Sequence, residues 1–167
     1  NKSVLVGPRR YGVLIATNYK IQTLDPKLFD IPWQERILSA NITHPKDTIE
    51  FHTAYIPPGS TNRWKKIETL EGIYKQLAVQ TGTKRILCGD FNTPQDELVK
   101  YGAVTFAQKI NKIGVPKLKE SFRGGSGKRW DEGERKILEG LKEYNLIDAY
   151  RHIHPIPKKA YSFEFVR

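Results

Sequence analysis

Sulfur is almost absent from this sequence, which holds one cysteine, Cys88, and no methionine in 167 residues. A single cysteine excludes an intramolecular disulfide framework and leaves no cysteine cluster for a structural zinc ion. No apolar run approaches the length of a membrane-spanning helix, and no signal-peptide pattern opens the chain. These absences favour an intracellular, cytoplasmic protein without a membrane partner. The apolar residues around Cys88 predict a buried structural thiol.

Acidic residues are outnumbered, with 18 Asp and Glu against 28 Lys and Arg and a formal net charge of +10. Such a surplus favours polyanionic partners through long-range attraction and counterion release. The same surplus also occurs in proteins that only need to stay soluble. Apolar residues make up 38% and aromatic residues 11% of the chain. That composition, at this length, predicts one folded domain with a substantial core.

The order of apolar and polar residues predicts the secondary structure. Alternating or apolar runs bounded by turn residues predict strands at 11–17, 20–24, 36–43, 48–56, the run that ends at Asp90, and 161–165. Helical spacing of apolar residues predicts a helix over 62–80 and a second helix that begins at Asp131, with Glu132 and Glu134 in its first turn, where the helix dipole favours acids. We expect 95–130 to be irregular, with a mobile glycine-rich loop at 124–127. Two neighbouring hairpins followed by strand–helix alternation predict an α/β sandwich with a mixed sheet.

Asp90 and Asn92 are the first candidate site residues, because they follow directly on a short apolar run. Side chains at i and i+2 of an extended chain point to one face, so we expect Phe91 to pack the opposite way. A carboxylate can bind a hard cation or accept a proton from water, and an amide donates hydrogen bonds without adding charge. The pair therefore suits phosphoryl chemistry. A structural alternative remains, because Asp and Asn also close turns after strands.

Several segments together resemble the endonuclease/exonuclease/phosphatase superfamily, which has the DNase I-like fold. The resemblance lies in Gly89-Asp90-Phe91-Asn92, Ala54-Tyr55-Ile56-Pro57-Pro58-Gly59-Ser60, the strand from Tyr11 to Ile15, the stretch from Leu146 to Pro155, and Tyr161-Ser162-Phe163. Their order and rough spacing are most similar to the exonuclease III and apurinic endonuclease type.

The resemblance implies a four-layer α-β-β-α sandwich and a Mg²⁺- or Mn²⁺-dependent phosphodiesterase that acts on double-stranded DNA in DNA repair. The residue that matches Asp90 prepares the attacking water and contacts the metal. The residue that matches Asn92 orients that carboxylate, and the residue that matches Tyr55 lies at the scissile phosphate. Each role is chemically reasonable, because Mg²⁺ keeps few protein ligands and a phenol donates a hydrogen bond.

Departures from the family pattern accompany the resemblance. Pro58 replaces an Asn, Phe163 replaces a Trp in many relatives, and Glu164 stands where an apolar residue is common. The family's metal-binding Glu and its Asp-His pair have no match in the sequence. We therefore expect residues 1–167 to be the central portion of a single domain that lacks its outer N- and C-terminal strands, and to be inactive alone.

Basic residues after Tyr55 are candidates for substrate binding. Arg63 and Lys66 can face a nucleic-acid backbone, although a solvated helix face is an equally good reading. Trp64 and Trp130 favour packing over base stacking. None of the four histidines matches a catalytic position.

Two other functions stay open at this point. One is a superfamily phosphodiesterase or phosphatase that acts on RNA, nucleotides or phospholipid headgroups. The other is a nucleic-acid-binding module that keeps the sheet but not the chemistry.

Overall fold

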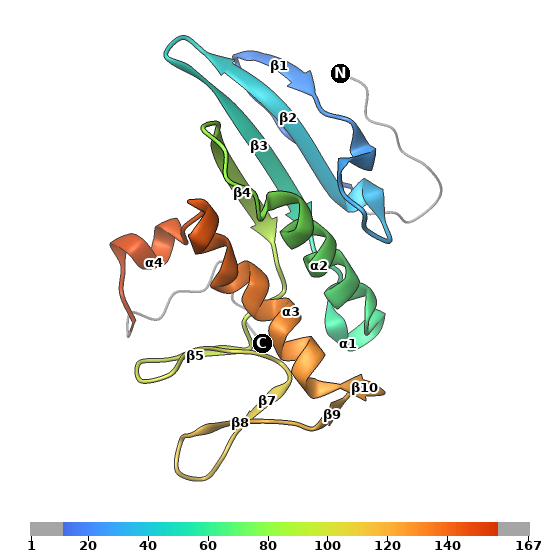
Figure 1. The fold of residues 1–167 in the computed structure, drawn as a ribbon, viewed down its shortest axis with the longest axis vertical. Coiled ribbons are helices and arrows are strands. Elements are labelled where there is room, and N and C mark those ends of the chain that lie inside the picture. The colour runs from blue at the N-terminus through green and yellow to red at the C-terminus, as the bar shows by residue number, and fades with distance from the viewer. Residues whose placement is uncertain (1–11, 157–167) are drawn as a thin grey trace, which may run out of the picture.

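A four-stranded mixed sheet organises the part of the chain that the computed structural model describes, residues 12–156 (Figure 1). Its strands lie in the order β1 (Lys20–Thr23), β2 (Ile37–His44), β3 (Asp47–Tyr55) and β4 (Lys84–Asp90). β2 pairs antiparallel with β1 and with β3, whereas β3 and β4 run parallel. The α/β class, the mixed sheet and these four strands are as predicted.

The two connections within the sheet follow from local sequence. β2 and β3 form a hairpin around a tight turn at residues 45–46, because Pro45 cannot continue the ladder. Parallel strands need a crossover, and between β3 and β4 the chain forms α1 (Gly59–Asn62) and α2 (Lys65–Leu77). Helix α2 lies within the predicted range 62–80.

The core forms where α2 packs on one face of the sheet, which we call the helix-side face. The predicted apolar stripe of α2 is buried there and supplies Ile67, Leu70, Ile73 and Leu77. The sheet contributes Ile37 and Ala54, which are paired in register and so share that face. Trp130 of the next helix completes the cluster and is fully buried, which agrees with the prediction that it packs rather than stacks on bases.

The segment that we expected to be irregular has regular structure. It forms three short hairpins: β5 (Asp96–Leu98) with β6 (Gly102–Val104), β7 (Gln108–Ile110) with β8 (Pro116–Leu118), and β9 (Ser121–Phe122) with β10 (Gly125–Ser126). Residues 124–127 are not an irregular loop either, because Gly125 and Ser126 form β10 and a helix begins at Gly127. Ser126 caps helix α3 (Gly127–Leu138) by accepting a hydrogen bond from the Arg129 N–H at 3.3 Å. A Cβ at Gly127 would lie 1.7 Å from the Lys119 carbonyl oxygen, so glycine here allows close packing.

The remaining described elements are short. They are η1 (Pro26–Leu28), η2 (Gln34–Arg36), η3 (Gly140–Tyr144) and α4 (Ala149–Ile153). Residues 12–17 form no strand, so the predicted hairpin of 11–17 with 20–24 is wrong; β1 takes its hydrogen bonds from β2 instead. The strand predicted at 161–165 and Tyr11 lie outside the described residues. Within the described part of the chain, every helix is too short or too polar to cross a membrane.

Candidate active site at the carboxyl ends of β3 and β4

Tyr55 and Asp90 are the last residues of two adjacent parallel strands. They are partners in the register between β3 and β4, so their side chains lie on the same face of the sheet. The Ile56 N–H donates to the Asp90 carbonyl oxygen at 2.8 Å and ties the two strand ends together. Asp90 is exposed. The structure thus brings together two of the three predicted catalytic residues.

Gly89 makes this close approach of the strands feasible. Its φ of +134° lies in a region that residues with a side chain rarely adopt. A Cβ there would lie 1.9 Å from the Ala54 carbonyl oxygen and 2.8 Å from the Ala54 nitrogen. The glycine that precedes Asp90 therefore lets the backbone of β4 approach β3 just before the site residues.

Asn92, the third predicted residue, is held against Asp90 by a turn. Its φ is +49°, a left-handed conformation that Asn tolerates. Its backbone N–H donates to Asp90 Oδ1 at 3.0 Å, and its Nδ2 donates to the Ile56 carbonyl at 2.8 Å and to Asp90 Oδ2 at 3.4 Å. The structural alternative, in which Asp90 closes a turn after the strand, is therefore observed. Phe91 packs against the core, as predicted.

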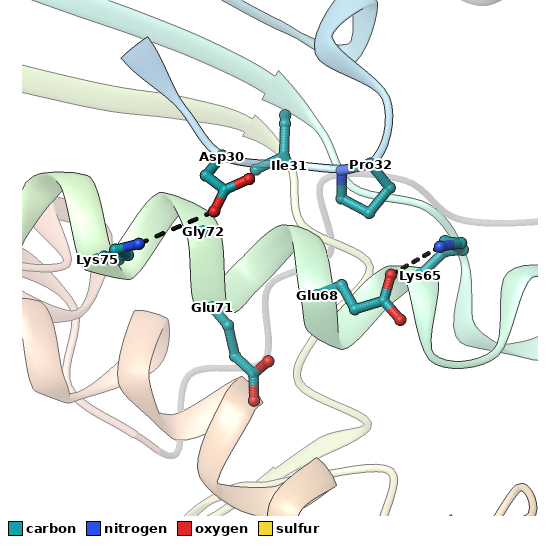
Figure 2. A pocket seen from close by; sticks show the side chains of 8 residues that line it. All are labelled: Asp30, Ile31, Pro32, Lys65, Glu68, Glu71, Gly72 and Lys75. Atoms are coloured by element: carbon teal, nitrogen blue, oxygen red, sulfur yellow. Dashed lines mark hydrogen bonds and ion pairs between the residues drawn. The ribbon is translucent and has the colours of Figure 1, made fainter. Parts of the chain in front are cut away.

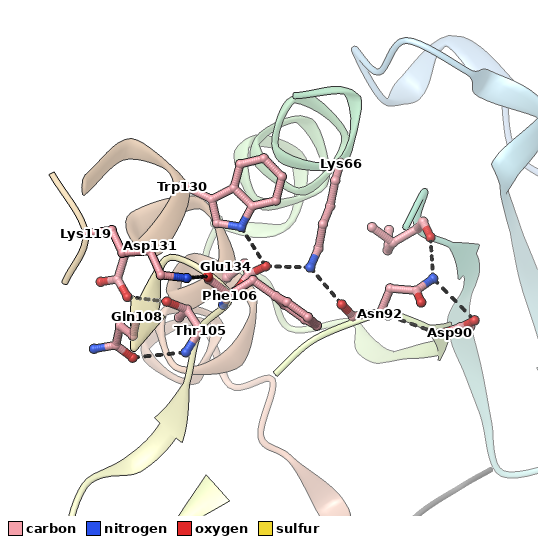
Figure 3. A network of polar contacts seen from close by, with 11 residues as sticks. Lys66, Asp90, Asn92, Thr105, Phe106, Gln108, Lys119, Trp130, Asp131 and Glu134 are labelled. Carbon is pink, nitrogen blue, oxygen red and sulfur yellow. Dashed lines mark hydrogen bonds and ion pairs between the residues drawn. The ribbon is translucent and has the colours of Figure 1, made fainter. Parts of the chain in front are cut away.

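A buried polar network contacts this turn at the backbone carbonyl of Asn92 (Figure 3). Lys66 Nζ donates to the Asn92 carbonyl at 2.7 Å and to Glu134 Oε1 at 2.5 Å. Trp130 Nε1 also donates to Glu134 Oε1, at 2.9 Å, and the Phe106 N–H donates to Glu134 Oε2 at 2.9 Å. The side chains of Lys66 and Glu134 are 1% and 0% exposed. Burial lowers the pKa of Lys66, and the Glu134 carboxylate opposes that shift.

Two expectations are corrected by this network. We expected Lys66 on the surface as a substrate-binding residue, but its ammonium is buried in an ion pair and does not face solvent. We placed Glu134 in the first turn of a helix that begins at Asp131, but α3 begins at Gly127, and Glu134 is buried against Lys66 of α2. Sequence spacing alone gave no signal for the pair, because 68 residues separate its members.

Arg36 is a site residue that sequence reasoning missed. Its guanidinium carbon lies 4.8 Å from the centre of the Tyr55 ring and 4.6 Å from that of Trp33. A cation over an aromatic face is attracted to it, so Arg36 packs against both rings. Nη1 of Arg36 is a buried donor without a hydrogen-bond partner.

Arg63 is exposed and lies directly after α1, where it adopts a φ of +46°. Of the two predicted substrate-binding residues, it is the one that solvent can reach. A cavity of about 60 Å³ opens nearby, lined by Gly59, Ser60, Phe106, Arg123 and Trp130. Arg123 Nη1 donates to the Ser60 carbonyl there at 3.2 Å.

A larger groove, of about 470 Å³, lies elsewhere, between residues 30–32 and α2 (Figure 2). Its acids face neighbouring cations: Lys75 lies 3.8 Å from Asp30, and Lys65 lies 2.8 Å from Glu68. None of the predicted site residues lines this groove, although Lys65, which precedes Lys66, does. Size alone therefore does not identify it as the functional site.

A metal ion at this site would have Asp90 as its carboxylate ligand from the described residues. Among residues 12–156, no three His, Cys, Asp or Glu side chains gather into a metal-binding group. Mg²⁺ is commonly bound by one or two carboxylates together with substrate phosphates and water. An exposed carboxylate beside a neutral amide and a phenol fits that pattern, with Asp90 as the ligand that this part of the chain supplies.

Comparison of the chain with protein-family models, with curated proteins and with solved structures gives no significant match.

Proposed function

We propose that this protein is a Mg²⁺- or Mn²⁺-dependent phosphodiesterase that cleaves duplex DNA, of the exonuclease III and apurinic endonuclease type. The observation that carries the proposal is the registered pair of Tyr55 and Asp90 at two strand ends, with the Asn92 amide at Asp90. In open α/β sheets, the carboxyl ends of the strands are where ligands usually bind.

Each residue has a role that its contacts support. Asp90 is exposed and accepts a proton from the attacking water. Asn92 Nδ2 donates to Asp90 Oδ2 and to a backbone carbonyl, so it fixes the direction in which the carboxylate presents its other lone pairs. Tyr55 donates its phenolic hydrogen to a phosphate oxygen, and the Arg36 guanidinium packs over its ring.

The metal supplies positive charge to the phosphate oxygens when it is bound. Asp90 is the residue of this chain that would hold it. The remaining ligands in this proposal are substrate oxygens, water and the acid that the family resemblance implies.

The α-β-β-α sandwich belongs to the same proposal, and the second face of the sheet supports it. Residues on this face alternate with those that meet α2, and they include Ile42, Ile49 and Phe51. Ile21 and Ile86 lie on it too, and they remain 41% and 42% exposed. A second sheet packed on this face would bury that apolar area.

Charge distribution supports duplex DNA as the substrate. From residue 98 to residue 119 there is no acid, and the segment carries Lys100, Lys109, Lys112, Lys117 and Lys119. Elsewhere in the described chain, several surface cations face acids, as in the pair of Lys84 with Asp47 at 2.6 Å. In Figure 1, the hairpins that contain these lysines lie beyond the end of the sheet toward which β4 points.

The test is an Asp90→Asn variant of the full-length protein, assayed on duplex and abasic DNA, with and without Mg²⁺. Asn keeps the shape but does not accept a proton, so turnover should fall by about 10²-fold or more while DNA binding persists. The matched control is Asp96→Asn, which removes an exposed acid from the next strand. Equal turnover in the Asp90→Asn variant and the wild type would reject the assignment. DNA binding without any metal-dependent cleavage in the wild type would favour the binding module.

A further inference from the structure

The Lys66–Glu134 pair connects α2 and α3 with the turn that carries the candidate site. We propose that this pair is a positioning device, which holds Asn92, and through Asn92 the Asp90 carboxylate, in the geometry that the reaction requires. This inference rests on the proposed function, and it assigns a role to two buried residues that do not touch the substrate.

The contacts on Asn92 come from two sides. Lys66 Nζ donates to the backbone carbonyl at 2.7 Å, and the side-chain amide donates to the Ile56 carbonyl at 2.8 Å. A residue at φ +49° has an extended alternative that costs less backbone strain. Rotation toward that alternative would swing the carbonyl away from Lys66 and the amide away from Asp90. The ammonium therefore favours the one conformation in which Asn92 reaches Asp90.

Glu134 fixes Lys66 in turn. Donors from Lys66, Trp130 and Phe106 occupy both of its carboxylate oxygens. The ammonium also lies 4.5 Å from the centre of the Phe106 ring, which closes it off from another side. Glu134 and Trp130 belong to α3, and Phe106 lies between β6 and β7, so contacts from two segments outside α2 limit the freedom of the ammonium to move away from the Asn92 carbonyl.

Stability alone is a weak reason for such a pair. Removing an ammonium and a carboxylate from water is costly, and apolar side chains of similar volume often replace a buried pair without loss of stability. Lys66 and Glu134 are almost fully buried, so the cost applies to both. The directional contact with Asn92 is what an apolar replacement would not supply.

The experiment uses a double variant, Lys66→Met with Glu134→Gln, in the full-length protein. Met fills the space of the lysine stem, and Gln keeps an oxygen that accepts from Trp130 or Phe106. The variant thus removes both charges together and deletes the donor to Asn92. The control is Arg129→Met with Glu71→Gln, because that pair also joins α3 to α2, at 2.8 Å, but lies on the surface and has no contact with Asn92.

Two readouts are measured well below the unfolding transition. The first is hydrogen exchange of the Asn92 backbone amide, which should become at least about 10-fold faster than in the control as the turn opens more often. The second is cleavage of duplex DNA, in which kcat should fall by about 10²-fold with KM within about 2-fold, because misplacement of a catalytic group acts on the chemical step.

The outcomes separate the two levels of inference. Faster exchange with a lower kcat supports the positioning role. Unchanged exchange and unchanged kcat in the double variant overturn it. If exchange accelerates but the wild type cleaves no more DNA than Asp90→Ala, the pair does hold the turn and the proposed nuclease function is what fails. If kcat falls equally in the control, the effect comes from joining the helices and the positioning role is rejected.

Discussion

Gly89→Ala should be among the most damaging single-methyl additions in this protein. The new Cβ would lie 1.9 Å from the Ala54 carbonyl oxygen, and Ala54 belongs to the adjacent strand, so relief requires a backbone shift. The φ of +134° adds backbone strain of about 1–3 kcal/mol, and overpacking adds about 1–3 kcal/mol. We therefore expect a loss of roughly 2–6 kcal/mol, a large fraction of the stability of a domain this size.

The matched control is Gly82→Ala, which lies just before the same strand and would place its Cβ in open space. Urea unfolding of both variants, followed by circular dichroism, measures the difference. The control should stay within about 0.5–1 kcal/mol of the wild type, as is usual for surface sites and compatible Gly→Ala changes. If the Gly89→Ala midpoint matches the control, β4 does not approach β3 as closely as described, and the registered pair of Tyr55 and Asp90 loses its basis.

Three further predictions concern chemistry, charge and pH. Tyr55→Phe keeps the ring under Arg36 but removes the hydroxyl, so DNA cleavage should slow while the unfolding midpoint stays unchanged; lower stability with an unchanged rate per folded molecule would make Tyr55 structural. Lys109 and Lys117 are direct partners across β7 and β8, so replacing both with Gln should reduce the slope of log K for duplex DNA against log salt by about 2, whereas Lys75→Gln should not. Burial lowers the pKa of His52 below 6.5, so the folded state favours the neutral ring. The contribution of His52 to the free energy of unfolding is therefore present above pH 6.5 and is lost as pH falls through the lowered pKa. A His52→Gln variant whose unfolding free energy has the same pH slope as that of the wild type would contradict this.

The sheet and α2 could be predicted because local pattern and tertiary structure agree there. β2 and β3 alternate with period 2, so their extended conformation could be predicted. The stripe from Ile67 to Leu77 has helical period, and α2 buries it. The hairpins between 96 and 126 were missed for the opposite reason. Their strands have two or three residues each, which is too short for periodicity to show.

In strand β3, the sequence pattern predicted which side chains share a face, but not which of the two faces is buried. Its apolar side chains Ile49 and Phe51 were expected to share one face, and the register agrees. In the described structure, however, the fully buried face carries His52, which bonds to Ser39 at 2.7 Å and to Glu50 at 2.8 Å. Hydrophobicity alone would select the other face. Hydrogen bonds to each ring nitrogen make the burial of a histidine acceptable, and those partners lie in part on another strand.

In the candidate site, too, the sequence predicted the contacts that local geometry determines and missed those between residues far apart in the chain. Gly89, Asp90 and Asn92 were predictable as a unit because a four-residue turn determines their geometry, and Tyr55 joined them through the family resemblance. Arg36 and the Lys66–Glu134 pair were not, because each acts across a separation that only the fold closes. A basic residue in a helix reads as solvent-facing in sequence, since ammonium groups are rarely buried. Lys66 departs from that expectation at the one place where a buried ammonium meets the carbonyl of Asn92, and this coincidence is the reason to test its role in the reaction rather than in stability.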